Sequence, residues 1–351
     1  MPLSHRGVPG QDLTDGLVRC ETWRDLTWLA RRSGPLETHM AVRHSRRILV
    51  PSSSGVHVMT SHAERTESAI AHAVLAEANR AHGMRFQLDR RMDRGAQSGA
   101  WLLTNRAGEY AVLKWSPNRH WAAQVLRAAD VVASVRAVGY PTPAWLAVGV
   151  SDDGLPYQIQ ELVPGSPVGR VTVDTVPMLI DLVESQRCVD PDPERCWSQY
   201  VTTTMTSGRT HLWQQVAGIG PIGRELLGAC EQLLAAHEPV FLPSGDLVHG
   251  DFRPDNIIFD AGRISGVVDI EALGSGSRVY DYATLLSAHN IEPGAQQMII
   301  AAGEQVAGPG PFAYCFAHVV LELAVFVHQS NLETGVGDLL DQRRRVVQLI
   351  P

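Results

Sequence analysis

The sequence predicts an α+β protein of two lobes, a small N-terminal lobe rich in β-strands and a larger, mainly helical C-terminal lobe. Three observations support this. Short alternating or apolar segments separated by turns fill residues 85–162, and helical patterns dominate after Pro164-Gly165. The 351 residues are also enough for two domains around a cleft. We place the N-lobe at residues 59–163 and the C-lobe at residues 164–351.

Hydrophobic periodicity assigns the N-lobe elements in order. A helix is expected first, because apolar residues recur every three to four positions and Gly83 stands at its C-cap. Strands, a second helix and a hairpin follow, and Asn105–Gly108 and Ser151–Gly154 provide the turns. The expected helices cover residues 64–81 and 118–138, and the expected strands cover residues 85–92, 100–104, 109–115, 145–150 and 157–162.

Residues 1–58 differ from the rest of the chain. They contain eight arginines and five acids, a net charge of +3, and the whole chain is at −7, so the remaining residues carry −10. No helical or strand period is sustained, and residues 51–55 are typical of a linker. We expect a disordered extension, or upstream sequence before a true start at Met59. An arm that binds nucleic acid or membrane would cluster its arginines, whereas these are dispersed.

Composition limits the location of the protein and its class. The five cysteines are scattered without CxxC spacing, which favours free thiols in a reducing compartment. We find no apolar run near the roughly 18 residues that span a bilayer, and no signal-peptide pattern at the N-terminus. We therefore expect a cytoplasmic protein without membrane partners. The acidic main body argues against nucleic-acid binding, and the oligomeric state stays open.

Lysine is almost absent. Of the 30 basic residues only Lys114 is a lysine, and a GC-rich coding sequence explains the general bias. A single lysine among arginines suggests a site that needs a compact ammonium rather than a planar guanidinium. Chance survival is the alternative.

The strongest motif lies in residues 247–259. Two apolar stretches flank a polar loop that holds His249, Gly250 and Asp251, with Asn256 five residues after the aspartate. A hairpin turn at residues 260–263 leads to a second expected strand, 264–271, which brings Asp269 beside the loop.

These residue types suit phosphoryl transfer. That reaction needs a carboxylate for the attacking hydroxyl, hard oxygen ligands for Mg²⁺ and a cation for the nucleotide. Asp251 suits the first role, Asn256 and Asp269 the second, and Lys114 the third. His249 is expected to brace the loop backbone rather than to transfer a proton.

The HGDxxxxN pattern followed by an aspartate on the next strand resembles the aminoglycoside phosphotransferase and choline kinase superfamily. The likeness covers roughly residues 65–330, including residues 279–283, where this superfamily has an aspartate at a helix start beneath the catalytic loop. It implies the bilobal protein-kinase-like fold, ATP as co-substrate and Mg²⁺ as cofactor.

The same resemblance implies the nucleotide-binding residues. Residues 95–100 are similar to the family's phosphate loop, residues 110–114 to its lysine strand, and residues 159–165 to its hinge. The expected contacts are backbone groups of the loop over the phosphates, a side chain on the adenine, and hinge backbone at the adenine edge. They would come from Gly95, Ser98, Gly99, Val112, Gln160 and Leu162.

The sequence departs from the family pattern in three places. The family pairs its nucleotide lysine with a helix glutamate, but residues 118–138 contain none, which leaves Asp130 as a candidate and Gln124 as the fallback. Residues 274–278 replace a Gly-Asp-Pro. Asp-Ile-Glu at residues 269–271 replaces the Asp-Phe-Gly of protein kinases, and no Ala-Pro-Glu follows, which favours a small-molecule acceptor.

The predicted reaction is transfer of the γ-phosphoryl group of ATP, or of GTP, to a hydroxyl of a small molecule. An aminoglycoside or other antibiotic is the first acceptor considered, with Glu271 and Glu322 as candidate acceptor-site acids. The alternatives are a metabolic kinase of choline, homoserine or methylthioribose type, or a non-catalytic nucleotide-binding relative.

Overall fold

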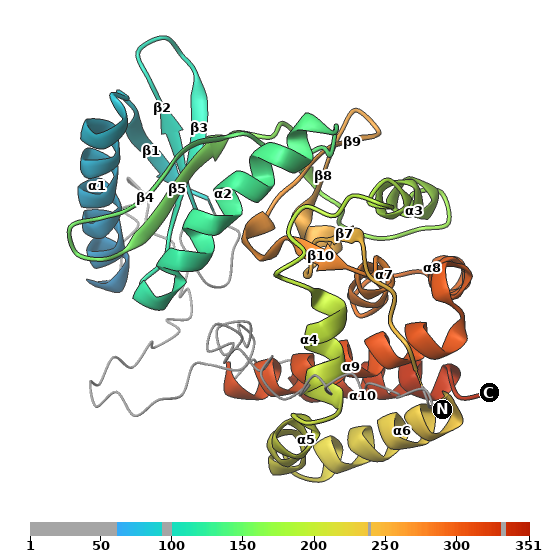
Figure 1. The fold of residues 1–351 in the computed structure, drawn as a ribbon. Helices are drawn as coiled ribbons and strands as arrows, with labels where there is room; N and C mark the ends of the chain where they lie inside the picture. Colours follow the sequence, from blue (N-terminus) through green and yellow to red (C-terminus); the bar gives the residue numbers. More distant parts are fainter. Residues whose placement is uncertain (1–61, 93–99, 238–239, 331–334) are drawn as a thin grey trace, which may run out of the picture.

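The computed structural model describes residues 62–92, 100–237, 240–330 and 335–351. The extension predicted at residues 1–58 and the phosphate-loop residues Gly95, Ser98 and Gly99 lie outside these described residues. Within them the chain forms two lobes, as expected: a sheet with two helices, and a larger helical part (Figure 1).

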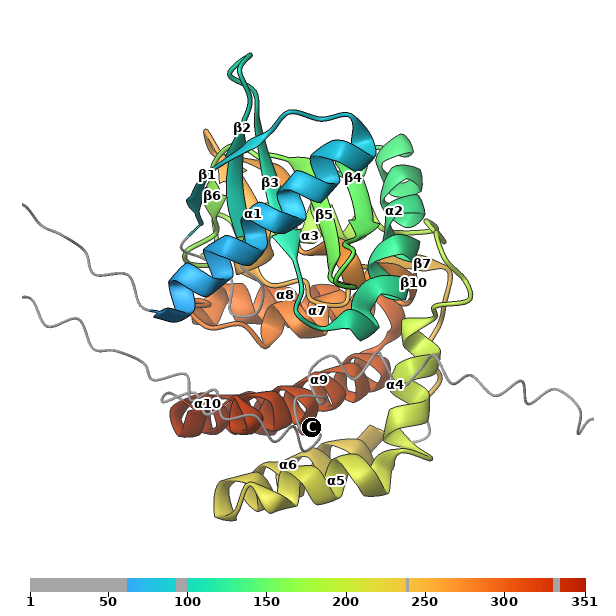
Figure 2. The same cartoon turned by 90° about the vertical axis from the view of Figure 1, so that its left-hand side faces the viewer.

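The N-lobe contains a five-stranded antiparallel sheet in the order β1-β2-β3-β5-β4. Figure 2 shows α1 lying across one face of this sheet. The predicted bounds of β2 and β4 are confirmed, and the other elements shift by a few residues. Their bounds are α1 (His62–His82), β1 (Gln87–Arg91), β2 (Ala100–Thr104), β3 (Tyr110–Trp115), α2 (Ala122–Ala137), β4 (Trp145–Val150) and β5 (Pro156–Glu161).

The two faces of this sheet differ in what covers them. Alternate residues of β3, among them Leu113, pack with α1 in a small core. Because side chains alternate along a strand, Val112 and Lys114 lie on the opposite face. Val112 is paired with Leu102 in β2 and Gln160 in β5, and these three side chains are buried on the face away from α1.

The C-lobe combines short strands with helices that pack around α9. The strands form a three-stranded sheet, β6-β8-β9, and a two-stranded one, β10-β7. The strands are β6 (Ser166–Pro167), β7 (Asp246–Val248), β8 (Ile257–Asp260), β9 (Arg263–Val267) and β10 (Gly274–Gly276). The helices are α3 (Val176–Glu184), α4 (Trp197–Met205), α5 (Arg209–Gly218), α6 (Pro221–His237), α7 (Val279–Leu286), α8 (Pro293–Ala307), α9 (Pro309–Gln329) and α10 (Gly335–Gln348).

Helix α9 corrects one expectation. By length and composition it is apolar enough to cross a membrane, although the sequence was expected to hold no such run. Buried residues make up 78% of its most apolar stretch, because α6, α7, α8 and α10 surround it. A helix enclosed on all sides is apolar all round, so burial in the core accounts for its composition.

Helix α2 packs against both lobes, since it lies against β4 and β5 of the N-lobe sheet and also against C-lobe segments. Its inward residues Val131, Val132 and Val135 are part of the large core that contains the C-lobe helices. Tyr140, just after the helix, joins the same core, whereas the core under α1 contains no α2 residue. The lobe boundary placed at residue 163 stays a prediction, and the core that contains these α2 side chains extends across it.

Candidate active site

The predicted catalytic loop follows β7 and is anchored from below by α7. The backbone N–H groups of His249 and Gly250 donate to the two carboxylate oxygens of Asp281, at 2.7 and 3.0 Å. Gly250 has φ +85, and a Cβ there would lie 2.1 Å from a ring carbon of Trp197. The loop therefore needs glycine at this position both for its backbone conformation and for the close approach of the indole.

His249 holds the loop backbone, as predicted. The Asp251 N–H donates to His249 Nδ1 at 3.2 Å, and Nε2 lies 3.0 Å from the carbonyl oxygen of Val268. An accepting Nδ1 leaves the proton on Nε2, so the ring is the neutral tautomer that donates to Val268. The imidazole is fully buried and joins the loop to the segment before Asp269.

Asp251 is held by two nearby residues in the chain. The guanidinium of Arg253 contacts both of its carboxylate oxygens, Nε to Oδ1 at 2.6 Å and NH2 to Oδ2 at 2.9 Å. The amide nitrogen of Asn256 donates to the backbone oxygen of Asp251 at 2.9 Å and to Oδ2 at 3.1 Å. The pKa of Arg253 is raised chiefly by the Asp251 charge. Sequence reasoning missed Arg253, although its place two residues after the aspartate was a signal.

Asp269 lies beyond a strand that ends earlier than predicted. β9 stops at Val267, and Asp269 adopts the left-handed conformation, φ 62 and ψ 45, before a short 3₁₀ turn (Ile270–Ala272). Aspartate tolerates this conformation better than most residues with a Cβ. The Val268 N–H donates to the Asn256 carbonyl at 2.8 Å, so the loop and the hairpin are joined beside the two side chains predicted to bind metal.

The side chain of Lys114 contacts two carboxylates. Its ammonium forms ion pairs with Asp269 and, at 2.6 Å, with Glu271. Burial alone would lower the pKa of Lys114, but these two charges reverse the effect and raise the pKa above its usual value. Gln158 of β5 also donates to the same oxygen of Glu271 at 2.6 Å. The structure therefore brings together Lys114, assigned to the nucleotide, and Asp269, assigned to the metal, in a contact that the sequence did not predict.

The partner predicted for Lys114 on the second helix is wrong. Asp130 is exposed on α2, while the buried positions of that helix begin with Gln124 and Val125. Gln124, the fallback, does not contact the lysine directly: its side chain donates to the backbone oxygen of Glu271 at 3.3 Å. The inward face of α2 thus reaches the segment that carries Glu271 instead of presenting an acid.

The two candidate acceptor-site acids are both engaged. Glu271 is bound by Lys114 and Gln158, which places it on the nucleotide side and does not support the acceptor role predicted for it. Glu322 on α9 is 4% exposed and accepts a 3.3 Å hydrogen bond from the hydroxyl of Tyr200. Burial raises the pKa of Glu322 to about 7, so it is partly uncharged near neutral pH.

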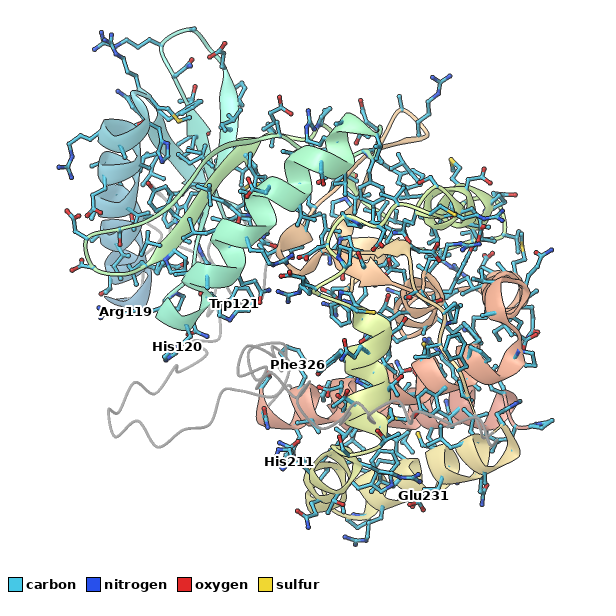
Figure 3. All side chains as sticks on the ribbon, in the orientation of Figure 1. Arg119, His120, Trp121, His211, Glu231 and Phe326 are labelled. Atoms are coloured by element: carbon cyan, nitrogen blue, oxygen red, sulfur yellow. The ribbon has the colours of Figure 1, made fainter. Side chains whose placement is uncertain are left out.

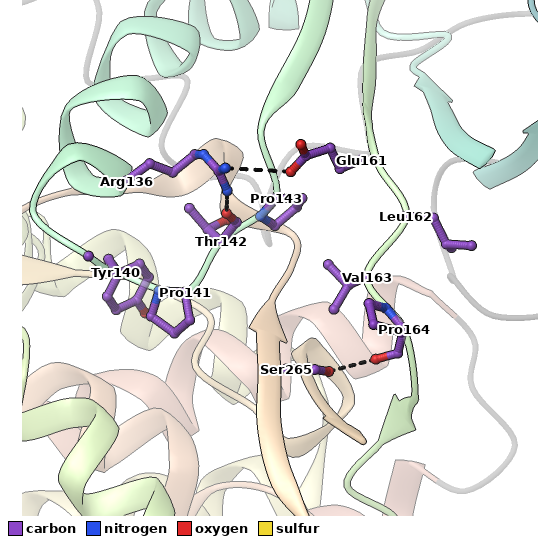
Figure 4. A pocket seen from close by; sticks show the side chains of 11 residues that line it. Arg136, Tyr140, Pro141, Thr142, Pro143, Glu161, Leu162, Val163, Pro164 and Ser265 are labelled. Atoms are coloured by element: carbon purple, nitrogen blue, oxygen red, sulfur yellow. Dashed lines mark hydrogen bonds and ion pairs between the residues drawn. The ribbon is translucent and has the colours of Figure 1, made fainter. Parts of the chain in front are cut away.

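The hinge, residues 159–165, is stabilised by contacts from the end of α2. Arg136 at the end of α2 forms a 3.5 Å ion pair with Glu161 and donates to the Thr142 carbonyl (Figure 4). These residues line a hollow of about 350 Å³ behind the connector. The Leu162 side chain points away from Arg136. Gln160 is buried in β5, and the adenine contacts assigned to Gln160, Leu162 and Val112 stay predictions.

The oxygen donors of the site fit a magnesium ion whose coordination sphere is completed by a bound ligand and water. In the described residues no group of three or more His, Cys, Asp or Glu side chains is arranged to hold a metal. Mg²⁺ in kinases usually takes one or two protein oxygens and fills its octahedron with phosphate oxygens and water. Asn256 turns its nitrogen toward Asp251, which leaves its oxygen for a cation, and Asp269 supplies a carboxylate.

Comparison with known proteins finds both homoserine kinases and aminoglycoside phosphotransferases. A homoserine kinase from Granulibacter bethesdensis is 39% identical over 67 residues, 19% of this chain and 20% of that protein. An aminoglycoside 3'-phosphotransferase from Escherichia coli is 25% identical over 185 residues, 52% of this chain and 65% of that protein. The chain thus spans a fifth of the length of the first relative and just under two thirds of the second.

A solved structure shares the fold. A thermostable mutant of aminoglycoside phosphotransferase APH(4)-Ia, in a ternary complex with AMP-PNP and hygromycin B, aligns with a TM-score of 0.56 at 16% identity. The alignment covers 75% of this chain and 94% of that protein. The predicted protein-kinase-like fold is therefore confirmed.

The match to a known protein family covers most of the N-lobe sheet and most of the C-lobe. The sequence pattern of the phosphotransferase enzyme family, APH, matches residues 90–315, well over half of the chain. That range contains Lys114, Asp251 and Asp269 as well as the connector between the lobes. The resemblance seen in the motifs is confirmed, and the chain belongs to the phosphotransferase enzyme family.

Proposed function

We propose that this protein transfers the γ-phosphoryl group of ATP to a hydroxyl group of a small molecule. The observation that carries the proposal is one site built from both lobes. Asp251 is held in a braced loop, and Asp269 on the adjoining segment reaches Lys114 on the N-lobe sheet. A base, an oxygen ligand and a phosphate-binding cation are the parts that phosphoryl transfer needs.

Asp251 is assigned to the acceptor. Arg253 and Asn256 fix its orientation, and a carboxylate oxygen that already accepts one hydrogen bond can accept another. The acceptor oxygen forms the new bond to the γ-phosphorus, the bond from that phosphorus to the β–γ bridging oxygen breaks, and the hydroxyl proton passes to Asp251. ADP and the phosphorylated alcohol are the products.

Lys114, Asn256 and Asp269 are assigned to the nucleotide. Lys114 exchanges part of its contact with Asp269 and Glu271 for phosphate oxygens, and its compact ammonium suits that exchange. Asn256 and Asp269 would hold Mg²⁺, which neutralises charge on the phosphates when it is bound. Positioning and fixed charges supply most of the expected rate enhancement.

The first acceptor class we propose is a cationic antibiotic of the aminoglycoside kind. Support comes from the −10 balance after residue 58 and from the aminoglycoside 3'-phosphotransferase relative. The labelled side chains His120 and Trp121 lie at the start of α2, above Phe326 of α9 and His211 of α5 (Figure 3). The acceptor hydroxyl must reach Asp251, so we look for the acceptor beside the catalytic loop.

A second candidate is a metabolic kinase, with homoserine as the amino-alcohol to test first. The observation in its favour is the 39% identity to a homoserine kinase, although over only 67 residues. A small zwitterion would need fewer contacts with the protein than an aminoglycoside.

The test is ADP release measured with a panel of aminoglycosides, macrolides, homoserine and choline. We expect one class to stimulate ADP release at least about a hundredfold, within the range that a positioned general base contributes. Product mass should increase by one phosphoryl group. Nucleotide binding without turnover for any acceptor would instead support the non-catalytic relative, and no nucleotide binding would reject the proposed function.

A further inference from the structure

Three successive carbonyls after Asp269 are each bound by a side chain. The Glu271 carbonyl accepts from Gln124 and, at 3.5 Å, from Arg127; the Leu273 carbonyl accepts from Arg127 at 2.9 Å. Between them, the Ala272 carbonyl accepts from the indole of Trp197 at 3.1 Å. All of these bonds come from side chains of α2 and α4, so this stretch of backbone is fixed by its surroundings.

Arg127 joins three parts of the molecule at this point. On α2 it lies one turn from Gln124, so both side chains leave the same face of the helix. One arm of its guanidinium pairs with Asp192 of the C-lobe, and the other donates to the carbonyls. The Asp192 N–H in turn bonds Ser275 of β10 at 3.0 Å. A planar guanidinium fork can serve a carboxylate and two carbonyls together, which an ammonium cannot do at this spacing.

The fixed backbone determines where the Glu271 carboxylate points. It meets Lys114 at 2.6 Å and Gln158 at 2.6 Å, both from the N-lobe sheet, and only 13% of the Glu271 side chain is exposed. The only acid of α2 itself, Asp130, is exposed and outside this network. The helix therefore acts on the lysine through a backbone segment of the other lobe.

We propose that Arg127 and Gln124 are positioning residues that hold Glu271 as the counter-ion of Lys114. The glutamate supplies from the C-lobe the negative charge that α2 lacks. It keeps the ammonium aimed along the path of the nucleotide phosphates. This inference rests on the proposed function, because it concerns how the nucleotide lysine is oriented.

The assignment makes a specific claim about magnesium. If Glu271 orients Lys114, its loss weakens nucleotide binding whether or not the metal is present. If Glu271 is instead a ligand of Mg²⁺, its loss weakens only the metal-dependent part. The affinities of AMP-PNP with Mg²⁺ and with EDTA therefore separate the two roles.

The experiment is calorimetric titration of AMP-PNP into the full chain and four variants. We expect Glu271→Gln and Arg127→Met each to weaken binding about tenfold, both with Mg²⁺ and with EDTA. The double variant should bind no worse than Glu271→Gln alone, because Arg127 acts through that glutamate. Arg345→Met is the control: Arg345 also donates to two backbone carbonyls, of Leu286 and Ala288, but far from the lysine.

The outcomes are distinct. Arg345→Met should lower the melting temperature and leave both affinities unchanged. Additive losses in the double variant, or a loss for Glu271→Gln that appears only with Mg²⁺, would overturn the inference. If Arg127→Met fails to fold, Arg127→Lys replaces it, since lysine keeps the Asp192 pair and loses the double carbonyl contact. Failure of the wild-type chain to bind AMP-PNP would reject the proposed function instead.

Discussion

The two halves of the candidate site are built in different ways. Around Asp251 the partners come from the same short stretch of chain: His249, Arg253 and Asn256 lie within five residues. Around Lys114 they come from far away, since Asp269 and Glu271 are 155 and 157 positions later. A loop that contains its own contacts can keep its geometry when the lobes shift, whereas the lysine network exists only when the lobes are together.

Because of this difference, we assign different roles to the two halves of the candidate site. On the proposed roles, the local half would perform the chemistry, which tolerates little displacement of the reacting atoms. The assembled half would bind the nucleotide, and its contacts would then have to loosen and reform when the nucleotide enters. The expected effects of substitutions below, from the largest to the smallest, test that division.

Asp251→Asn should have the largest effect, a loss of transfer of about a thousandfold, because an amide cannot accept the hydroxyl proton. Affinity for Mg-ATP should stay near that of the wild type. Asp269→Asn, in the assembled half, should also lose the Mg²⁺-dependent part of nucleotide binding, since an amide is a poorer ligand for a hard dication. Calorimetry with Mg-ATP compares the two, and equal losses of binding would mean that the roles are misassigned.

Glu322→Gln tests the buried contact between Glu322 and Tyr200, which are far apart in the sequence. The question is whether this contact affects stability without being part of the candidate site. The folded-state pKa of Glu322 is about 7, against 4.5 for the free side chain, so the folded state binds this proton more tightly. Its carboxyl should therefore cost stability as pH rises from about 4.5 through about 7, by up to about 3 kcal/mol.

The glutamine variant removes that titration while it can still accept from Tyr200. Urea unfolding at pH 4 and pH 8 should give equal stabilities at the lower pH and a more stable variant at the higher one. An unchanged pH dependence in the variant would assign the titration to another group.

Lys114→Arg should weaken nucleotide binding about tenfold to a hundredfold. The wider fork cannot occupy the space between Asp269 and Glu271 in the same way as the ammonium. Nucleotide titration measures the loss, and wild-type kinetics would remove the lysine from the proposed site. Arg344→Lys is a suitable control, because Arg344 forms an exposed ion pair on α10.

Arg253→Gln should lower kcat about tenfold while nucleotide affinity changes little. The guanidinium orients Asp251 by two contacts and lies in the local half. The kcat and KM for ATP, determined at saturating acceptor, separate these effects. A large rise in KM for ATP with unchanged kcat would place Arg253 in the nucleotide half instead.

Removal of residues 1–58 should have no effect on folding or nucleotide affinity. The reason is their aperiodic sequence, interrupted by proline and serine, before the alternative start at Met59. Soluble yield and AMP-PNP titration of the shortened chain check the prediction. Loss of soluble protein would show that the segment is needed.

The same contrast explains what could be predicted from the sequence. The loop around Asp251 is a contiguous motif, so the spacing of its residues was enough to select it as the candidate site. Strands such as Ala100–Thr104 were predicted from their apolar pattern. Asp130 was misassigned because a helical wheel does not say which face of α2 turns inward until packing is known. Arg127 and Gln158 were missed because their contacts with the segment after Asp269 join residues more than a hundred positions apart.

The packing of α2 has a consequence for chimeric proteins made from members of this family. A crossover at the hinge, near residue 163, would separate Val131, Val132 and Val135 from the core side chains that evolved beside them. An exchange restricted to α1 and the strands of the sheet would keep α2 with these partners but would separate it from β4 and β5, which it also contacts. Helix α2 therefore has packing partners on both sides of either crossover, and a stable chimera needs its contacting side chains in both lobes to come from the same parent.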